Sequence, residues 1–279
     1  MRTRRALYAL ALLLAGTALA PAFDEGGGTA SSAEKPVPQA HADSIAETRR
    51  ALGFYRDGRK VEAADIFAAA AARGHVPAQW KLARMLATGD GIEPDLPRAV
   101  ALYTAIAERF AYRDPALRAV PFVADATREA GRMQLAGHAG PRDVRAARRH
   151  LWRAATTYRD AEARYLLGLS LLDEAHGSPQ PVTAYGWLRA ATALGHPAAA
   201  VRMGEMLAAG EGTKADPVAG LILMARGVER AKEADRPTLA LRFQTVRADM
   251  DEAVRAGVDS QLLALNLSAA AQPVLTAAD

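Results

Sequence analysis

The stretch AAVRMGEMLAAGEG, residues 199–212, carries the pattern that decides the fold of this chain. Within it, Ala199 stands five positions before a second small residue, Gly204, and the large apolar Met203 comes just before that glycine. The last two steps between copies of this pattern are 37 and 36 residues long, and a period in this range is typical of a solenoid of stacked helix pairs. The other copies are Ala78/Ala83, Ala126/Gly131 and Ala163/Gly168.

A second pattern repeats with the same period. The tetrapeptide Arg-Ala-Ala-Thr at 153–156 returns at 189–192, 36 positions later. Half of the 279 residues are hydrophobic but only 6% are aromatic, and the frequent alanine is the best helix former. No long run alternates apolar and polar residues as a strand does. The sequence therefore predicts an all-α fold, an α-solenoid of about five antiparallel helix pairs in which a helix A is followed by a helix B.

The helical repeats are expected over residues 43–234. The first pair starts near Asp43 and its helix B spans 61–73. The step from the second pair to the third is 48 residues, so 111–123, which contains two prolines, is expected to be an inserted loop. Residues 235–279 are expected to form a C-terminal helical cap and tail, with a long amphipathic helix over 237–257 and a short one over 260–271. The other four pairs are expected at 78–88 and 96–110, 125–136 and 143–158, 161–172 and 182–194, and 198–209 and 217–231.

The N-terminus has the layout of a secretory signal peptide. Three arginines precede an apolar run at 6–15 and then small residues, so residues 1–22 are predicted to be removed by cleavage after Ala22. Residues 23–42 are rich in Gly, Ser, Ala and Pro and are expected to be a disordered linker. No later apolar stretch is long enough to span a membrane, and the chain has no cysteine. These features together predict a mature protein in the periplasm without a membrane span.

The net charge of +4 depends on the predicted signal peptide. Removing its three arginines from the 35 basic residues leaves 32, against 31 acidic residues. The mature chain is therefore close to neutral, and no nucleic acid is expected among its partners.

The repeated residues resemble the Sel-one-like repeat, a relative of the tetratricopeptide repeat, over roughly residues 45–231. The family pattern is Ala-x-x-x-Leu-Gly-x-Met-Tyr, a Gly-x-Gly turn, then an aromatic pair and Ala-Ala before Gly-His. The copies closest to this pattern are residues 199–212 and Trp187-Leu188 before Gly195-His196. Ala83 departs from it by replacing the glycine. The resemblance implies a helical repeat protein that binds other proteins.

A narrower resemblance concerns the order of segments. A short linker after the exported segment, the opening stretch Gly-Arg-Lys-Val-Glu-Ala at 58–63, an insertion after the second pair and a helical C-terminus are similar to the ExoR-type regulators. This similarity implies a periplasmic regulator that binds the sensor kinase of a two-component system and holds it inactive, which affects exopolysaccharide production. The alternative is a structural scaffold in cell-envelope assembly or secretion.

No set of residues has the pattern of an active site. The six histidines are scattered, and no two have the i, i+4 spacing of a helical metal site. His75 and His196 occupy equivalent breaks between helices, which indicates a capping or turn role. The acidic turn at 90–95 lacks the ligand alternation of a calcium loop and is expected to cap two helices. No catalysis, cofactor or metal is expected.

The repeat phase predicts the partner-binding face. In each helix A, the small residues and their apolar neighbours share one side. The residue three positions before the second small residue and the residue one position after it lie on the opposite side of the helix. The A helices of such repeats line the concave face, where aromatic residues and arginine are typical interface anchors. The alternative is that the aromatic residues pack against the next repeat. The predicted residues are Trp80, Arg84, Arg128, Arg132, Tyr165 and Leu169.

A second candidate surface is a basic stripe on one helix B. Its arginines recur at spacings of three and four residues and so share one helical face. They form either the solvated outer side of the helix or a docking stripe for an acidic partner or an anionic glycan. The residues of this stripe are Arg142, Arg145, Arg149 and Arg153.

Overall fold

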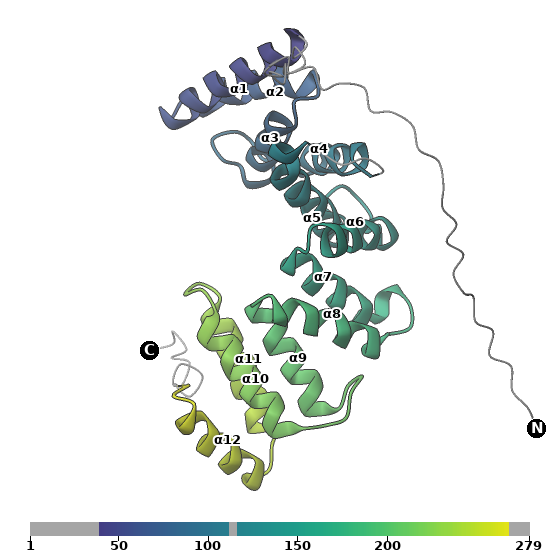
Figure 1. Ribbon diagram of the computed structural model, residues 1–279, viewed down its shortest axis with the longest axis vertical. Coiled ribbons are helices and arrows are strands. Elements are labelled where there is room, and N and C mark those ends of the chain that lie inside the picture. Colours follow the sequence, from purple (N-terminus) through teal and green to yellow (C-terminus); the bar gives the residue numbers. More distant parts are fainter. Residues whose placement is uncertain (1–38, 112–115, 268–279) are drawn as a thin grey trace, which may run out of the picture. The chain divides into compact units, whose positions relative to one another are not determined.

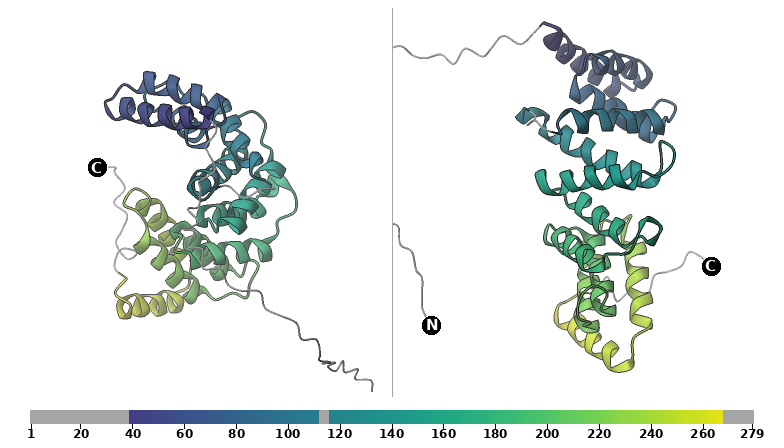
Figure 2. Two further views of the ribbon diagram at one scale, coloured as in Figure 1. Left: turned by 45° about the horizontal axis from the view of Figure 1, so that its top comes forward. Right: turned by 90° about the vertical axis from the view of Figure 1, so that its right-hand side faces the viewer.

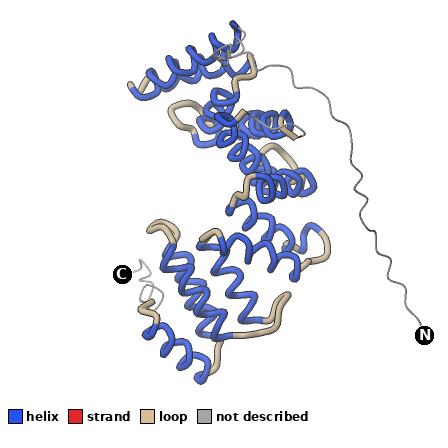
Figure 3. Tube along the Cα trace, viewed as in Figure 1, coloured by secondary structure: helices blue, strands red, loops and turns tan. Residues whose placement is uncertain are grey.

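The computed structural model describes residues 39–111 and 116–267, and all the regular structure in these ranges is helical (Figures 1 and 3). The predicted all-α fold is confirmed. The A helices are α1 (Gln39–Arg56), α3 (Val76–Thr88), α5 (Val120–Ala136), α7 (Ala161–Leu172) and α9 (Pro197–Ala209). The B helices are α2 (Lys60–Ala72), α4 (Leu96–Arg109), α6 (Val144–Thr157), α8 (Pro181–Ala193) and α10 (Pro217–Arg230). Then follow α11 (Arg236–Ala248) and α12 (Glu252–Ala264).

Each helix from α1 to α10 packs on the next one along the chain, which produces the stack of helix pairs seen in Figure 2. The A helices also contact each other directly, α3 with α5 and α5 with α7, and α9 contacts α11. We call the side formed by α3, α5, α7, α9 and α11 the A face. The side formed by α4, α6, α8 and α10 is the B face.

The helix ends lie where local capping residues stand in the sequence. Gly89 and Gly210 end α3 and α9 in the left-handed conformation, with φ of 66° and 74°, which glycine adopts without steric cost. The side chains of Asp95 and Asp216 accept hydrogen bonds from backbone N–H groups in the first turns of α4 and α10. The turn at 90–95 thus ends one helix and caps the next, as predicted.

The small residues of the repeat permit close contact between helices A and B. A Cβ added to Gly168 would lie 2.9 Å from Cγ of Leu188 in α8, and one added to Gly204 would lie 2.5 Å from the carbonyl oxygen of Gly220 in α10. Ala83, which replaces the family's glycine, is fully buried. These contacts explain why the small positions recur with the period of the repeat.

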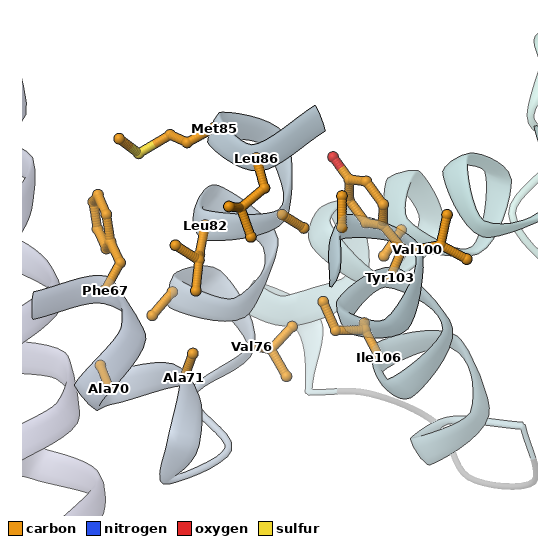
Figure 4. Packing of buried hydrophobic residues seen from close by; sticks show 14 of the residues in the cluster. Phe67, Ala70, Ala71, Val76, Leu82, Met85, Leu86, Val100, Tyr103 and Ile106 are labelled. Atoms are coloured by element: carbon orange, nitrogen blue, oxygen red, sulfur yellow. The ribbon is translucent and has the colours of Figure 1, made fainter. Parts of the chain in front are cut away.

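The core consists of apolar side chains between successive helices. Figure 4 shows Phe67 of α2 beside Leu82 and Met85 of α3, with Tyr103 and Ile106 of α4 on the other side of α3, and all five are buried. This cluster extends from α1 to α5, and further clusters continue it through α10 to α12. No helix pair buries its apolar face alone.

The helix α5 begins earlier than predicted. Residues 120–123, expected as the end of an inserted loop, form its first turn, and a 3₁₀-helix at Leu117–Ala119 precedes them. Pro121 suits a helix start because its missing N–H needs no partner there. Phe122 packs edge-on against the ring of Trp80 in α3, at 5.2 Å between ring centroids, and Val123 is fully buried. These tertiary contacts stabilise the added turn.

The prediction of one long helix over 237–257 was wrong, because two helices occupy this region. The chain breaks after α11, and the side chain of Asp251 caps α12 by accepting a hydrogen bond from the N–H of Val254 at 2.8 Å. The apolar side chains of the predicted amphipathic helix still share one core, because residues of α11 and α12 belong to one buried cluster with α10. The prediction of a separate short helix over 260–271 was also wrong for the part of that range that the structure describes, which ends at residue 267. Residues 260–264 belong to α12, which extends to Ala264.

The N-terminal predictions fall mostly outside the described residues. The predicted signal peptide, 1–22, lies outside the described residues, and so does the predicted linker, 23–42, except for 39–42. Helix α1 begins at Gln39, four residues before the expected start at Asp43. Within 39–111 and 116–267, no helix combines the length and the hydrophobicity needed to cross a bilayer.

Candidate binding surfaces

The first part of the A face is the junction of α3 and α5. The indole N–H of Trp80 donates to Oδ2 of Asp125 at 2.6 Å, and its ring packs on Phe122, so Trp80 is half-buried between two repeats. Arg84, one turn further along α3, is exposed, and its guanidinium lies 4.9 Å from the centre of the Trp80 ring. Trp80 therefore joins repeats, while Arg84 is available to a partner.

Arg128 and Arg132 of α5 belong to a network of ion pairs. Arg128 binds Asp125 and also Asp160, at 3.0 Å, so it connects α5 to the residue that caps α7. Glu129 lies between the two arginines, 3.1 Å from Arg128 and 2.7 Å from Arg132. Burial opposes the charge of Arg128, but the three carboxylates outweigh burial and raise its pKa. Arg128 is thus part of the structure of the A face and not an unpaired anchor.

Tyr165 of α7 lies in a groove of about 450 Å³ between α7, α9 and α11. Its ring stacks on that of His196 at 4.7 Å between centroids, and Nε2 of His196 lies 2.7 Å from Oε2 of Glu162. The hydrogen bond from His196 outweighs burial and lowers the pKa of Glu162, while burial raises the pKa of Tyr165. Lys232 and Asp235 line the same groove, which combines aromatic and charged groups.

The structure does not unite the six predicted A-face residues into one open surface. A ring contact, a hydrogen bond to Asp125 and ion pairs connect Trp80, Arg84, Arg128 and Arg132 at the α3–α5 junction, whereas Tyr165 lines a separate groove. Leu169 is half-buried and does not line that groove. Further along, α11 covers α9, and Arg242 of α11 binds Glu205 at 2.6 Å.

On the B face, α6, α7 and α8 enclose a second groove, of about 560 Å³. Three residues of the predicted basic stripe line it: Arg145, Arg149 and Arg153. Arg142, the fourth, does not, and its guanidinium lies 3.8 Å from a carboxylate oxygen of Asp173. The predicted stripe did not include the other polar and aromatic residues that line the groove, which are Arg148, Trp152, Thr183 and Trp187.

The signal for Trp152 was present in the sequence, because it stands between two arginines of the predicted stripe. Its side chain is 56% exposed, which is unusual for a residue this large and apolar. Trp187 comes from the next helix B, so only the packing of α8 beside α6 could place it here.

Three histidines, His75, His150 and His196, make contacts within the stack of repeats. His75 and His196 both precede an A helix, but Nδ1 of His75 lies 2.8 Å from Oγ1 of Thr48, whereas Nδ1 of His196 accepts from the N–H of Ala199. Burial, with the nearby charge of Arg153, lowers the pKa of His150 in α6. Among the residues that the structure describes, no cluster of histidine and carboxylate side chains could hold a metal ion.

Comparison with known proteins agrees with the repeat period. The Sel1 repeat family model matches residues 76–109, 124–156, 161–196 and 197–231. Two solved structures share the fold, each with a TM-score of 0.61. One is a Sel1 repeat protein of Oxalobacter formigenes, 18% identical, over 86% of this chain and 90% of that one. The other is a protective antigen of uropathogenic Escherichia coli with the same repeat fold, 20% identical, over 85% of this chain and 50% of that one.

Two curated relatives share one name. A protein of Rhizobium leguminosarum bv. viciae is 32% identical over 189 residues, which cover 66% of this chain and 68% of the relative. A protein of Rhizobium meliloti (strain 1021) is 29% identical over 246 residues, which cover 85% and 84%. Both are named exopolysaccharide production negative regulator. The chain therefore belongs to the Sel1 repeat proteins and, among them, to the family of these regulators.

Proposed function

We propose that this protein is an exported regulator of exopolysaccharide production that acts by binding another protein, the periplasmic part of a membrane sensor kinase. The observation that carries the proposal is the similarity to two exopolysaccharide production negative regulators over most of the chain. A stack of helix pairs exposes a long side-chain surface, which suits binding of a macromolecule. The repeat fold and the names of these relatives fit a protein without catalytic activity.

The partner is proposed to bind the A face. Two features support this location. The exposed Arg84 has no carboxylate partner among the described residues, and its guanidinium lies against the indole ring of Trp80. The groove at Tyr165 offers an aromatic pair beside Lys232 and Asp235, a mixture typical of protein interfaces.

Charge reversal at exposed positions of the A face tests the proposal. Arg84→Glu and Lys232→Glu change two separate parts of this face and leave the half-buried Trp80 intact. Each variant is expected to weaken binding of the purified kinase domain about tenfold or more in calorimetry, as loss of an interface anchor does. The control is Arg226→Glu on α10, which is also exposed and should bind as the wild type does.

Two results would contradict the proposal. Wild-type affinity of both A-face variants would place the partner elsewhere. Failure of the wild-type protein to bind the kinase domain, together with stoichiometric capture of several envelope proteins, would favour the scaffold function.

A further inference from the structure

We propose that the B-face groove between α6 and α8 is a binding site for an acidic sugar, a carboxylated mono- or disaccharide unit. This proposal is independent of the kinase partner, because it concerns the opposite helices of the repeats. The groove combines four arginines with two tryptophans, and none of the described residues that line it carries a negative charge.

The described residues that line the groove do not neutralise its positive charge. Helix α6 contributes Arg145, Arg148, Arg149 and Arg153 and contains no acidic residue. Arg145 and Arg149 are exposed and have no hydrogen bond or ion pair with the described residues. They stand four residues apart, so they lie on the same side of the helix one turn from each other. Such a pair is complementary to a carboxylate, which a guanidinium binds through two parallel hydrogen bonds.

Two further guanidinium groups are held in fixed positions. Arg148 donates to the backbone carbonyl of Ser170 and, at 3.2 Å, to its hydroxyl, while Arg153 donates to the carbonyl of Ala107 at 2.6 Å. A neutral carbonyl orients each guanidinium without cancelling its charge. A bound anion would therefore meet donors that are already in place, which reduces the entropy lost on binding.

The tryptophans require an apolar surface on the ligand as well as a charge. Trp152 is 56% exposed, and Trp187 faces the same groove from α8 with Leu167 and Leu171 beside it. One face of a pyranose ring carries C–H groups, whose slight positive charge suits the negative face of an indole ring. Inorganic phosphate has no such surface, so the aromatic half of the groove indicates a carboxylated sugar.

The size of the groove favours a small ligand over a protein. Its volume of about 560 Å³ lies within the range of roughly 300–1,000 Å³ that is usual for small-molecule sites. Ten of the described residues line it, whereas a stable protein interface takes about 20–30 residues from each side.

Calorimetric titration of the full-length exported protein with digalacturonate tests the proposal, with neutral galactobiose as the matched sugar. Digalacturonate should bind and galactobiose should not. The double variant Arg145→Gln/Arg149→Gln should weaken binding about tenfold or more, and Trp152→Ala should do the same without opening the core. The matched control is Arg226→Gln/Arg230→Gln, which removes two exposed arginines with the same spacing from α10 and should leave binding unchanged.

Circular dichroism of each variant separates loss of binding from loss of fold. Because the replaced side chains are exposed, the melting temperatures should stay at the wild-type value. Four results would overturn the proposal: no binding of digalacturonate, equal binding of galactobiose, unchanged affinity of both groove variants, or tighter binding of inorganic phosphate, a glutamate hexapeptide or a deoxythymidine hexamer than of the sugar.

Discussion

Replacing Gly204 by alanine tests whether close backbone contact holds α9 on α10. The added Cβ would lie 2.5 Å from the carbonyl oxygen of Gly220 and 2.5 Å from Cγ of Met224, whereas ordinary contact starts at 3.4 Å. The methionine side chain can move, but the carbonyl belongs to the backbone of α10. The two helices would therefore have to separate, and the packing of neighbouring side chains would loosen.

The magnitude follows from two opposing effects. Overpacking of a close contact costs about 1–3 kcal/mol. Alanine recovers up to about 1 kcal/mol because it is a better helix former than glycine. We expect a net loss of about 1–2 kcal/mol in the free energy of unfolding, which lowers the melting temperature of a protein of this size by about 2–8 °C.

Thermal melts followed by circular dichroism provide the measurement, and two other helical glycines calibrate it. A Cβ at Gly186 in α8 would meet no atom within 4 Å, so Gly186→Ala should melt at or above the wild-type temperature. Gly168→Ala should fall between these variants, because the nearest atom belongs to the side chain of Leu188, and the nearest backbone atom, the carbonyl oxygen of Ala184, is 3.3 Å away. If Gly204→Ala melts as high as Gly186→Ala, the backbone contact does not limit the packing of α9 on α10.

Three further predictions concern other parts of the chain. Trp80→Phe keeps the aromatic packing on Phe122 but removes the N–H donor to Asp125, so urea unfolding should show a loss of about 1–2 kcal/mol; an unchanged midpoint would mean that this bond adds nothing to the α3–α5 junction. The lowered pKa of Glu162 means that its contribution to stability is present above its ordinary pKa of about 4.3 and is lost as the pH falls through the lower folded value, so the stability gap between wild type and Glu162→Gln should shrink as the pH falls below about 4. Mass spectrometry of the exported protein should find Phe23 as its first residue, and a protein that keeps Met1 in the cytoplasm would contradict export.

The positions of most helices follow from the sequence because their signals are local. Gly89 and Gly210 end helices, and Asp95 and Asp216 cap the next ones, through atoms only a few residues away. The small residues recur with the helix pairs because each repeat makes the same close contact. The boundaries of α7 agree with the prediction at both ends.

Only the tertiary structure decides features that depend on residues far apart in the chain. The first turn of α5 forms because Phe122 meets Trp80, and the break between α11 and α12 leaves the apolar stripe intact because both helices pack with α10 in one cluster. The contact with Phe122 fixes Trp80 between repeats, which is the alternative that its position in the repeat had left open.

The B-face groove illustrates the same division. The sequence shows that Arg145, Arg149 and Arg153 share one side of a helix, because helical spacing is a local property. That Trp187 faces them from α8 follows from the packing of one repeat on the next. Helical periodicity determines which side chains share a face, but the contacts between repeats determine which of those faces close into a site.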